Sequence, residues 1–512
     1  MQQQESRVKK SLLNARVNLI FYFLTLVLSF FSRKIFLDRL GADFIGLTGT
    51  IGNLLGFLNL AESGVSAAIA VVLYAPLFER NEQKIKEIVS VMGFLYHAIG
   101  KIILVSGFVL ACFFPLIFSN VELELPIVYF TFISFLGTSL IGYFINYKQV
   151  LLSADQRNYV VAAYSQSANI IKILLQMGLA YYIGNYYLWV VVEFLFGILY
   201  SIILDWKIKQ VYPWLVTDIK QGKALCEKYP DVMRYTKQLF VHKIGSVAYT
   251  QVTPFLIYAF ASLQAVAYYG NYTLITSKFS LLLTNFLGGT NASVGNLIAE
   301  GDKDKILKVY WELMSIRFLF TGITVFAMYY LLPPFIVLWL GKEYVMSEVL
   351  LFLVLVSFAL SIIRGVTEEF LFGYGLFSDV WSPFIEATIL IVVAMFGGIL
   401  WGLEGTLLGA IVSSIIVIYI WKPYFLFSKG MKIPVRVYWF ELSKYLFAIS
   451  ASFYLLKLLL EHVSFHLAIY VSWLDWMLYA VIVVVLCMFV QGGVLGIFTK
   501  GTRDVCVRLL KK

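Results

Sequence analysis

Residues 470–497 read YVSWLDWMLYAVIVVVLCMFVQGGVLGI and contain a single charged side chain, Asp475. An α-helix rises about 1.5 Å per residue, so about 20 apolar residues cross a hydrocarbon layer roughly 30 Å thick. A strand of a membrane β-barrel is only about 10 residues long and alternates apolar with polar side chains. The stretch therefore predicts a membrane-spanning α-helix and excludes a barrel strand.

The rest of the chain has the same character. Of its 512 residues, 60% are hydrophobic and only 14% are charged, and the mean hydropathy is +0.83. Soluble domains are about 45–50% apolar and about 25% charged. With so few charges the chain cannot cover a water-facing surface of ordinary size. The composition predicts an all-α, polytopic integral membrane protein.

Similar apolar runs recur along the sequence and predict about fourteen transmembrane helices. The predicted spans are 15–37, 43–76, 88–117, 125–149, 158–183, 186–206, 238–260, 264–298, 308–339, 347–373, 381–401, 405–427, 437–460 and 470–497. The first run is not followed by a small-residue cleavage site, so we expect an uncleaved first span.

The basic residues support this threading. With a cytoplasmic N-terminus and alternating sides, the cytoplasmic segments hold 28 of the 40 Lys and Arg residues, and the opposite side holds four. The remaining eight fall within spans. Cytoplasmic loops of membrane proteins carry an excess of Lys and Arg. The net charge of +10 therefore reports topology, and both termini are expected in the cytoplasm of a bacterial inner-membrane protein.

The basic stretch 207–237 divides the predicted spans into six and eight. We expect an N-lobe over 1–206, a cytoplasmic linker over 207–237, a C-lobe over 238–428, and spans 13 and 14 with a basic tail over 429–512. Gly46 to Ile85 and Gly270 to Ile306 have a similar layout, which favours an internal duplication with a site between the halves. Two helical hairpins that are alike by chance remain an alternative.

Several cations fall inside the predicted spans. A charge there is costly unless it faces the bundle interior or a wet cavity. With Arg33 and Lys34 near the outer end of the first span included, ten basic residues oppose six acidic ones, so a phosphate-bearing substrate could supply the missing anions. Snorkelling of long side chains to an interface is the alternative. The predicted cationic cavity consists of Arg33, Lys34, Lys101, Lys172, Lys243, Lys278, Arg317 and Arg364.

Three acids are candidates for coupling or for ion pairs. Arg364 and Glu368 are spaced i,i+4 and share a helix face, whereas Glu369 points about 100° further round the helix. Glu62 is a lone acid in the second span. Proton coupling is one interpretation. The alternatives are a neutralising pair for Arg364 and a hydrogen-bonded neutral side chain for Glu62.

The sequence contains no sign of a cofactor or of catalysis. Neither a Gly-rich phosphate loop nor a zinc pattern appears, and the four cysteines are scattered: Cys112, Cys226, Cys487 and Cys506. Neither a disulfide framework nor a metal site is indicated. We expect no cofactor, no metal, no catalytic residue and no nucleic-acid partner.

Short motifs carry a family resemblance. They are FLDRLG at 36–41, LAESGV at 60–65, LYAPL at 73–77, YKQVLLSADQR at 147–157 and GLEGTLLG at 402–409. In this order they resemble the Wzx-like polysaccharide-repeat-unit flippases of the multidrug/oligosaccharidyl-lipid/polysaccharide exporter superfamily. The resemblance covers roughly residues 7–430 and extends over the last two spans by layout.

Membership would imply fourteen helices in two lobes around a central cationic cavity. The partner would be an oligosaccharide on polyprenyl diphosphate, moved by alternating access from the cytoplasmic to the outer leaflet for O-antigen, lipopolysaccharide, capsule or exopolysaccharide synthesis. Other polysaccharide-assembly proteins are further expected partners.

Two other functions stay open. A cation-coupled drug antiporter of the same superfamily needs an acid to hold a cation, yet the first span has no acid before Asp38. A membrane-embedded glycan polymerase or glycosyltransferase needs a sizeable outer loop, and the predicted outer loops are mostly under about 15 residues.

Overall fold

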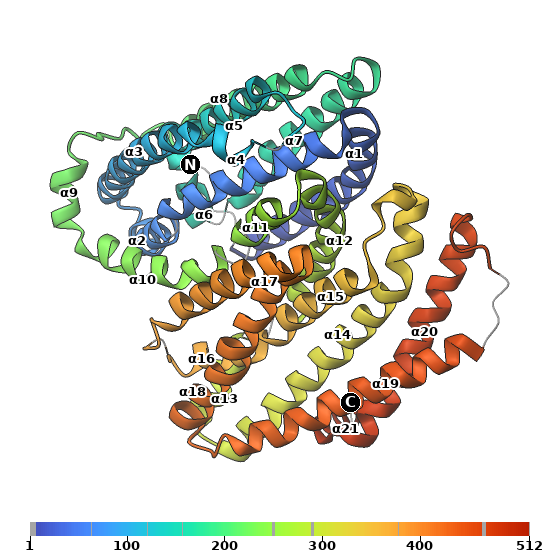
Figure 1. Ribbon diagram of the computed structural model, residues 1–512. Helices are drawn as coiled ribbons and strands as arrows, with labels where there is room; N and C mark the ends of the chain where they lie inside the picture. Colours follow the sequence, from blue (N-terminus) through green and yellow to red (C-terminus); the bar gives the residue numbers. More distant parts are fainter. Residues whose placement is uncertain are drawn as a thin grey trace. The chain divides into compact units, whose positions relative to one another are not determined.

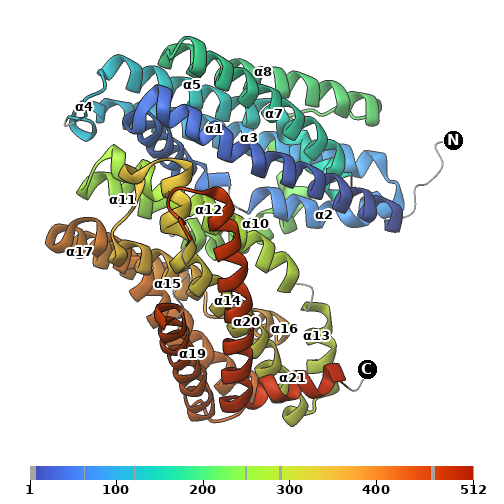
Figure 2. The ribbon, with the colours of Figure 1, turned by 90° about the vertical axis from the view of Figure 1, so that its right-hand side faces the viewer.

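The computed structural model describes residues 7–62, 64–119, 121–155, 157–247, 251–287, 291–376, 378–462 and 467–510, all in helices and their connections. The chain forms two compact units, residues 1–267 and 268–512, and the boundary falls within α12 (Leu263–Leu287). Figures 1 and 2 show the helices of both units. Each unit is described by itself.

Unit 1 is a bundle of long helices. Helices α1 and α7 lie side by side, as do α5 and α8, while α3 packs against both α2 and α5. Its elements are α1 (Arg7–Leu58), η1 (Asn59–Glu62), α2 (Val65–Glu79), α3 (Glu82–Cys112), α4 (Phe114–Ile117), α5 (Leu125–Phe144), η2 (Asn146–Lys148), α6 (Gln149–Ala154), α7 (Asn158–Tyr182), α8 (Tyr186–Val211), α9 (Gly222–Lys228), α10 (Pro230–Val247) and α11 (Thr253–Phe260).

Unit 2 is built around α14, which packs against α15, α19, α20 and α21. An aromatic core fills the space beside it, where Trp311 stacks on Tyr445 with ring centroids 5.6 Å apart. Its elements after α12 are α13 (Asn291–Glu300), α14 (Lys303–Trp339), η5 (Lys342–Tyr344), α15 (Glu348–Ile363), α16 (Gly365–Gly373), α17 (Ser382–Ser413), the π-helical η6 (Ser414–Trp421), α18 (Lys422–Phe425), the π-helical η7 (Leu426–Met431), α19 (Arg436–His462), α20 (Trp473–Phe498) and α21 (Lys500–Leu510).

Side-chain caps fix where several helices begin. Asn81 accepts a hydrogen bond from the Lys84 amide at the start of α3, and Asn185 does the same for Leu188 in α8. Asp302 accepts from the amides of Asp304 and Lys305 at the start of α14. Each cap satisfies amide groups that the first helical turn leaves without a partner.

Several predicted spans contain breaks. The predicted span 43–76 begins in the second half of α1, after a kink at Gly41 (φ 77°), and is interrupted between η1 and α2. The predicted span 347–373 is divided at Arg364 into α15 and α16. Helix α17 reverses at Trp401 and Gly402 and so contains the predicted span 381–401 and the start of the next one.

A close backbone contact holds this last reversal together. A Cβ on Gly405 would lie 1.9 Å from the carbonyl oxygen of Gly397. Small residues at such positions let helix backbones approach each other in membranes. The GLEGTLLG stretch therefore forms a tight helical hairpin.

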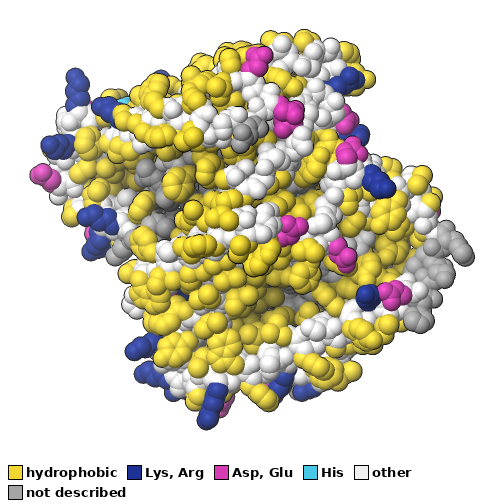
Figure 3. All heavy atoms as spheres, viewed as in Figure 1, with side chains coloured by type: hydrophobic (Ala, Val, Ile, Leu, Met, Phe, Trp, Pro, Cys, Tyr) yellow, Lys and Arg dark blue, Asp and Glu magenta, His cyan; other side chains and the backbone are white. Residues whose placement is uncertain are grey.

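Hydrophobic side chains cover much of the face that Figure 3 shows. Among the described residues, nine helical segments are long and apolar enough to cross a membrane. The chain is thus an all-helical, multi-pass membrane protein. One of these segments, Ser382–Met431, contains two of the predicted spans, so the count of fourteen stays a prediction.

The compact units and the predicted lobes differ in extent. Helices α9 and α10, which include the predicted linker and the following span, belong to unit 1, where α10 packs against α2. The internal duplication and its lobe boundaries stay predictions.

Candidate functional site

Polar side chains gather in unit 1 where α1 ends. Glu62 lies in η1, and its carboxylate Oε1 accepts hydrogen bonds from Ser66 Oγ at 3.0 Å and from Tyr96 Oη at 2.5 Å. The same short helix begins with Asn59, whose Oδ1 accepts from Ser139 Oγ and Tyr143 Oη at 3.1 and 3.0 Å. The described contacts of Glu62 are hydroxyl groups rather than a cation. We call Asn59, Glu62, Ser66, Tyr96, Ser139 and Tyr143 the hydroxyl cluster.

A second polar group joins α7 to α8. Lys172 Nζ lies 2.6 Å from Glu193 Oε1, and Gln176 Nε2 donates to the other carboxylate oxygen at 3.0 Å. The Lys172 and Glu193 side chains are only 17% and 23% exposed. Glu193 therefore neutralises Lys172 within the unit.

Three further predicted cavity cations also lie in unit 1. Arg33 Nη2 donates to the Ala267 carbonyl at 2.7 Å, and Lys34 lies 3.6 Å from Asp38 on an exposed stretch of α1. Lys101 is exposed on α3 beside exposed Ile102 and Val105, and no ion pair to a described residue accompanies it. It stands eleven residues before Cys112, the end of this apolar helix, or about 16 Å along the axis.

Two predicted cavity cations have less defined surroundings. Lys278 is half-buried on α12 and takes part in a polar or electrostatic interaction there. Lys243 lies on α10, and its side chain falls outside the described residues. The surroundings of these two lysines indicate no role for their side chains.

In unit 2 a buried ion pair joins α14 to α16. Arg317 Nη2 pairs with Glu369 Oε1, and the two side chains are 7% and 9% exposed. Arg317 Nη1 also donates to the Ile362 carbonyl at 2.9 Å. Gly365 leaves room for the guanidinium, because a Cβ there would lie 2.4 Å from Nη1.

Side chains from other helices bind backbone carbonyls beside the break between α15 and α16. The Ile362 carbonyl accepts from Arg317. The Leu360 carbonyl accepts from Tyr419 Oη at 2.6 Å in addition to the Arg364 amide at 3.2 Å. Backbone groups freed inside a hydrocarbon layer need such partners. Arg317 therefore stabilises a discontinuous helix as well as a buried carboxylate.

Arg364 stands at the break itself and contacts two acids. Its Nε and Nη2 donate to Glu368 Oε1 at 2.9 and 2.6 Å, and its Nη1 lies 3.7 Å from Glu386 Oε1 on α17. The i,i+4 spacing thus gives the contact expected from the sequence, while Glu369 points to Arg317. The partner Glu386 was not predicted, because sequence spacing does not relate α16 to α17.

The predicted surplus of in-span cations is smaller in the structure. Besides the pairs above, Lys444 lies 2.7 Å from Glu441, and Lys457 lies 3.8 Å from Glu461. These acids are three or four residues away on the same helix face, and the count from the sequence left them out. Among the described predicted cations, Lys101 is the clearest candidate for an anion from outside the chain.

A buried pair at the end of η6 was also missed. Lys422 Nζ lies 3.0 Å from Asp379 Oδ2, and Asp379 is 4% exposed. Nothing in the sequence links residues this far apart. Among the described residues no group of three His, Cys, Asp or Glu side chains gathers as metal ligands.

Comparison with known proteins places the fold. No protein-family model and no curated protein sequence matches the chain. The solved structure of the lipid II flippase MurJ, in an inward closed conformation, is similar with a TM-score of 0.63 and 17% identity over 95% of this chain and 99% of that chain. An inward-facing multidrug resistance MATE family transporter of the MOP superfamily gives 0.60 and 14% over 82% of this chain and 99% of that chain. The chain has the fold that these transporters share.

Proposed function

We propose that the protein is a flippase for oligosaccharide repeat units linked to polyprenyl diphosphate. It moves them by alternating access from the cytoplasmic to the outer leaflet of a bacterial inner membrane, for O-antigen, capsule or exopolysaccharide synthesis. The observation that carries this proposal is the likeness to the lipid II flippase MurJ over 95% of this chain and 99% of that one.

The extent of the two likenesses favours a flippase over a drug transporter. The MATE structure covers 82% of this chain, whereas the flippase covers 95%. The difference of 13% of 512 residues is long enough for about two spans with their loops. The likeness to the flippase therefore includes a part of the chain for which the MATE structure has no counterpart.

The distribution of charge supports an anionic, lipid-linked cargo. Lys101 is an exposed cation within a long apolar helix, and a lysine there is least costly when it faces water or an anion. Lys172, Arg317 and Arg364 already have acid partners. We therefore assign phosphate contact to Lys101, and assign the acid-paired cations to holding the helices in place.

Breaks in the helices support movement. The interruptions at η1 and at Arg364 each lie beside a polar cluster. Discontinuous helices next to the binding site are a recurring feature of transporters with alternating access. We propose that the hydroxyl cluster, and Arg364 with its partners Glu368 and Glu386, exchange contacts as the protein alternates between its inward-facing and outward-facing states.

A second candidate function is a cation-coupled antiporter. The observation in its favour is Glu62, an acid whose described contacts are hydroxyl groups. In an antiporter this carboxylate would bind the coupling cation. Loss of an antiporter would sensitise cells to toxic cations and leave glycan export intact.

The decisive experiment is depletion of the protein in the cell that makes it. We expect lipid-linked repeat units to accumulate on the cytoplasmic leaflet with their chemical structure complete. Leaflet position is read by whether an added glycosidase reaches the glycans in intact and in permeabilised spheroplasts. Incomplete glycans would favour an enzyme, and unchanged glycans with greater drug sensitivity would favour the antiporter.

A further inference from the structure

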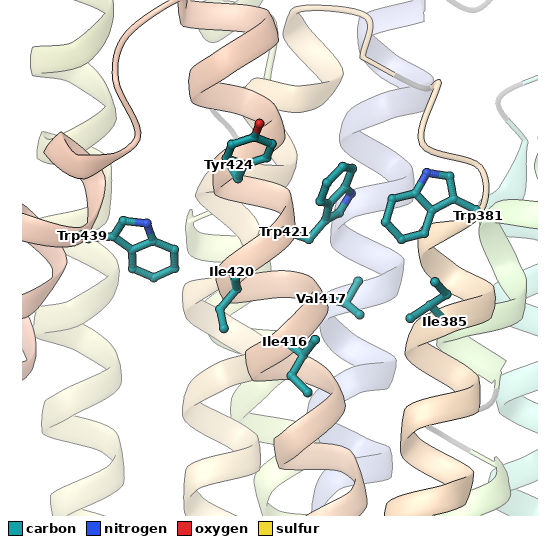
Figure 4. Close-up of a pocket in the computed structure, with 8 residues that line it drawn as sticks. All are labelled: Trp381, Ile385, Ile416, Val417, Ile420, Trp421, Tyr424 and Trp439. Carbon is teal, nitrogen blue, oxygen red and sulfur yellow. The ribbon is translucent and has the colours of Figure 1, made fainter.

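An aromatic groove lies within unit 2, beside the buried pair of Lys422 and Asp379. It has a volume of about 340 Å³ and runs between α17, η6 with α18, and α19. Trp381, Trp421, Tyr424 and Trp439 line it, together with aliphatic side chains from α17 and η6 (Figure 4). A lining of aromatic and aliphatic side chains suits hydrocarbon rather than a polar ligand.

The aromatic wall is held in place from beneath. Trp421 Nε1 lies 3.4 Å from the buried Asp379 Oδ2, whose charge Lys422 neutralises at 3.0 Å. The Trp421 ring stacks on Phe425 and lies 4.6 Å from the Trp381 ring, centroid to centroid. The groove is therefore a built feature of unit 2, and the acid beneath it is already paired.

Three cations follow α18, in the segment that leads into α19. Lys429, Lys432 and Arg436 are exposed, and none makes an ion pair with a described residue. Arg436 precedes Trp439 by three residues on α19, so the two side chains are neighbours on that helix. Lys429 lies in η7, directly after α18, Lys432 lies in the turn that follows, and Arg436 begins α19. The three cations therefore lie along the connection between two elements that form the groove.

One of these cations occupies an unusual backbone position. Lys432 has φ 55°, a left-handed conformation that glycine adopts far more readily than lysine. The turn is fixed, because the Ile433 amide donates to the Phe427 carbonyl at 2.9 Å. The chain therefore carries a cation at a point where local geometry favours glycine.

We infer that the groove binds an anionic glycerophospholipid, with an acyl chain among the tryptophans and the phosphate on Lys429, Lys432 and Arg436. Tryptophan and tyrosine are enriched at the level of lipid headgroups, and clusters of Lys and Arg at helix ends attract anionic lipids. The inference does not depend on what the protein transports.

Charge and size distinguish this occupant from two others. A second copy of the chain packed symmetrically on the groove would bring like cations together, which is unfavourable. A polyprenyl tail is much longer than an acyl chain, and the volume is near the lower end of the range of about 300–1,000 Å³ for small-molecule sites. A phospholipid matches both the apolar groove and its cationic end.

The test uses the full chain in phosphatidylcholine vesicles with increasing fractions of phosphatidylglycerol carrying brominated acyl chains. Bromine quenches nearby tryptophans, and the chain has eleven. The part of the quenching that is absent from a Trp381→Phe/Trp421→Phe/Trp439→Phe variant therefore reports occupancy of the groove. The variant Lys429→Gln/Lys432→Gly/Arg436→Gln removes the three charges, and its glycine suits the left-handed turn. The matched control is Lys342→Gln, an exposed cation in η5 far from the groove in sequence.

We expect the wild-type protein and the Lys342→Gln variant to prefer phosphatidylglycerol over brominated phosphatidylcholine. The triple variant should lose that preference by on the order of 100-fold, since each of the three cations near an anionic lipid contributes roughly fivefold. Lys432→Gly alone should lose about fivefold while its melting temperature stays unchanged or rises. Equal quenching by both lipids, an unchanged preference in the triple variant, or displacement by polyprenyl phosphate at equimolar concentration would each overturn the inference.

Discussion

Arg317 on α14 and Glu369 on α16 form an ion pair in which both side chains are almost fully buried, 7% and 9% exposed. The same guanidinium binds the Ile362 carbonyl at the end of α15. One side chain therefore joins three helices across a break. Removing one partner of a buried pair costs about 3–5 kcal/mol, whereas replacing both with apolar residues is often neutral.

The first prediction concerns this pair. Arg317→Ala and Glu369→Ala should each lower the stability of the protein in detergent by about 3–5 kcal/mol, and Arg317→Met/Glu369→Met should recover most of the loss. Tryptophan fluorescence during unfolding measures it. Lys457→Gln is the control, because its pair with Glu461 is 61% and 56% exposed and such pairs contribute about 1 kcal/mol or less. Single variants as stable as the wild type would contradict the role of this pair.

The second prediction concerns the hairpin in α17. Gly405→Ala should destabilise the protein by about 1–3 kcal/mol, because its Cβ would lie 1.9 Å from the Gly397 carbonyl oxygen. Gly178→Ala is the matched control on α7, where an added Cβ meets nothing within 4 Å. Alanine there should stabilise the helix by about 0.5–1 kcal/mol. Equal effects of the two substitutions would show that the hairpin tolerates a wider separation.

Long apolar helices were predictable from the sequence because their composition leaves no other way to satisfy backbone groups in a hydrocarbon layer. The predicted span 470–497 forms α20 (Trp473–Phe498), close to the predicted bounds. The breaks were harder to see, since residues such as Arg364 interrupt a run whose hydropathy is continuous. Breaks depend on side chains that cap the freed carbonyls from other helices.

Contacts within one helix were predictable from the helical period, whereas contacts between helices were not. Arg364 and Glu368 follow from their i,i+4 spacing. Glu386 reaches Arg364 from another helix, and the hydroxyls around Glu62 come from α2 and α3. Such partners depend on how helices pack, and the period of one helix contains no information about its neighbours.

The third prediction is topological. In a variant without the native cysteines, Lys429→Cys should react with an impermeant maleimide only after the membrane is permeabilised, and Lys342→Cys should react in intact cells. The physical reason is the excess of Lys and Arg on the cytoplasmic side. Both positions are exposed, so burial does not limit labelling. The reverse pattern would overturn the orientation of the chain.

The fourth prediction separates a transporting cation from a structural one. Lys101→Gln should fold normally, because the side chain is exposed, yet reduce glycan export by about 10- to 150-fold through loss of a charge-assisted hydrogen bond of roughly 1.5–3 kcal/mol. Lys172→Gln should instead lower stability, because it removes the charge that neutralises Glu193 at 2.6 Å. Export at matched membrane protein level is the measurement.

The conservative change tests the same point more sharply. Lys101→Arg keeps the charge and should restore most of the export, while Lys172→Arg should restore the melting temperature. Normal export by Lys101→Gln would remove Lys101 from the proposed site. Normal export by alanine variants at all eight predicted cations would contradict the cationic cavity as a whole.

The last prediction concerns Arg364, which lies between Glu368 at 2.6 Å and Glu386 at 3.7 Å. Arg364→Ala leaves two acids without their shared cation, so loss of folding would obscure any loss of transport. Arg364→Ala/Glu368→Gln/Glu386→Gln removes the three charges together and should recover the membrane level and melting temperature of the wild type. Its export should still fall below about one tenth of the wild-type level if the guanidinium takes part in transport, a loss of about 1.4 kcal/mol or more.

Arg364→Lys should recover folding but only part of the export, because a lysine is a point charge that cannot span both acids with a planar fork. Full export by the neutral triple variant would show that Arg364 serves only to neutralise its neighbours, and phosphate contact would then rest with Lys101.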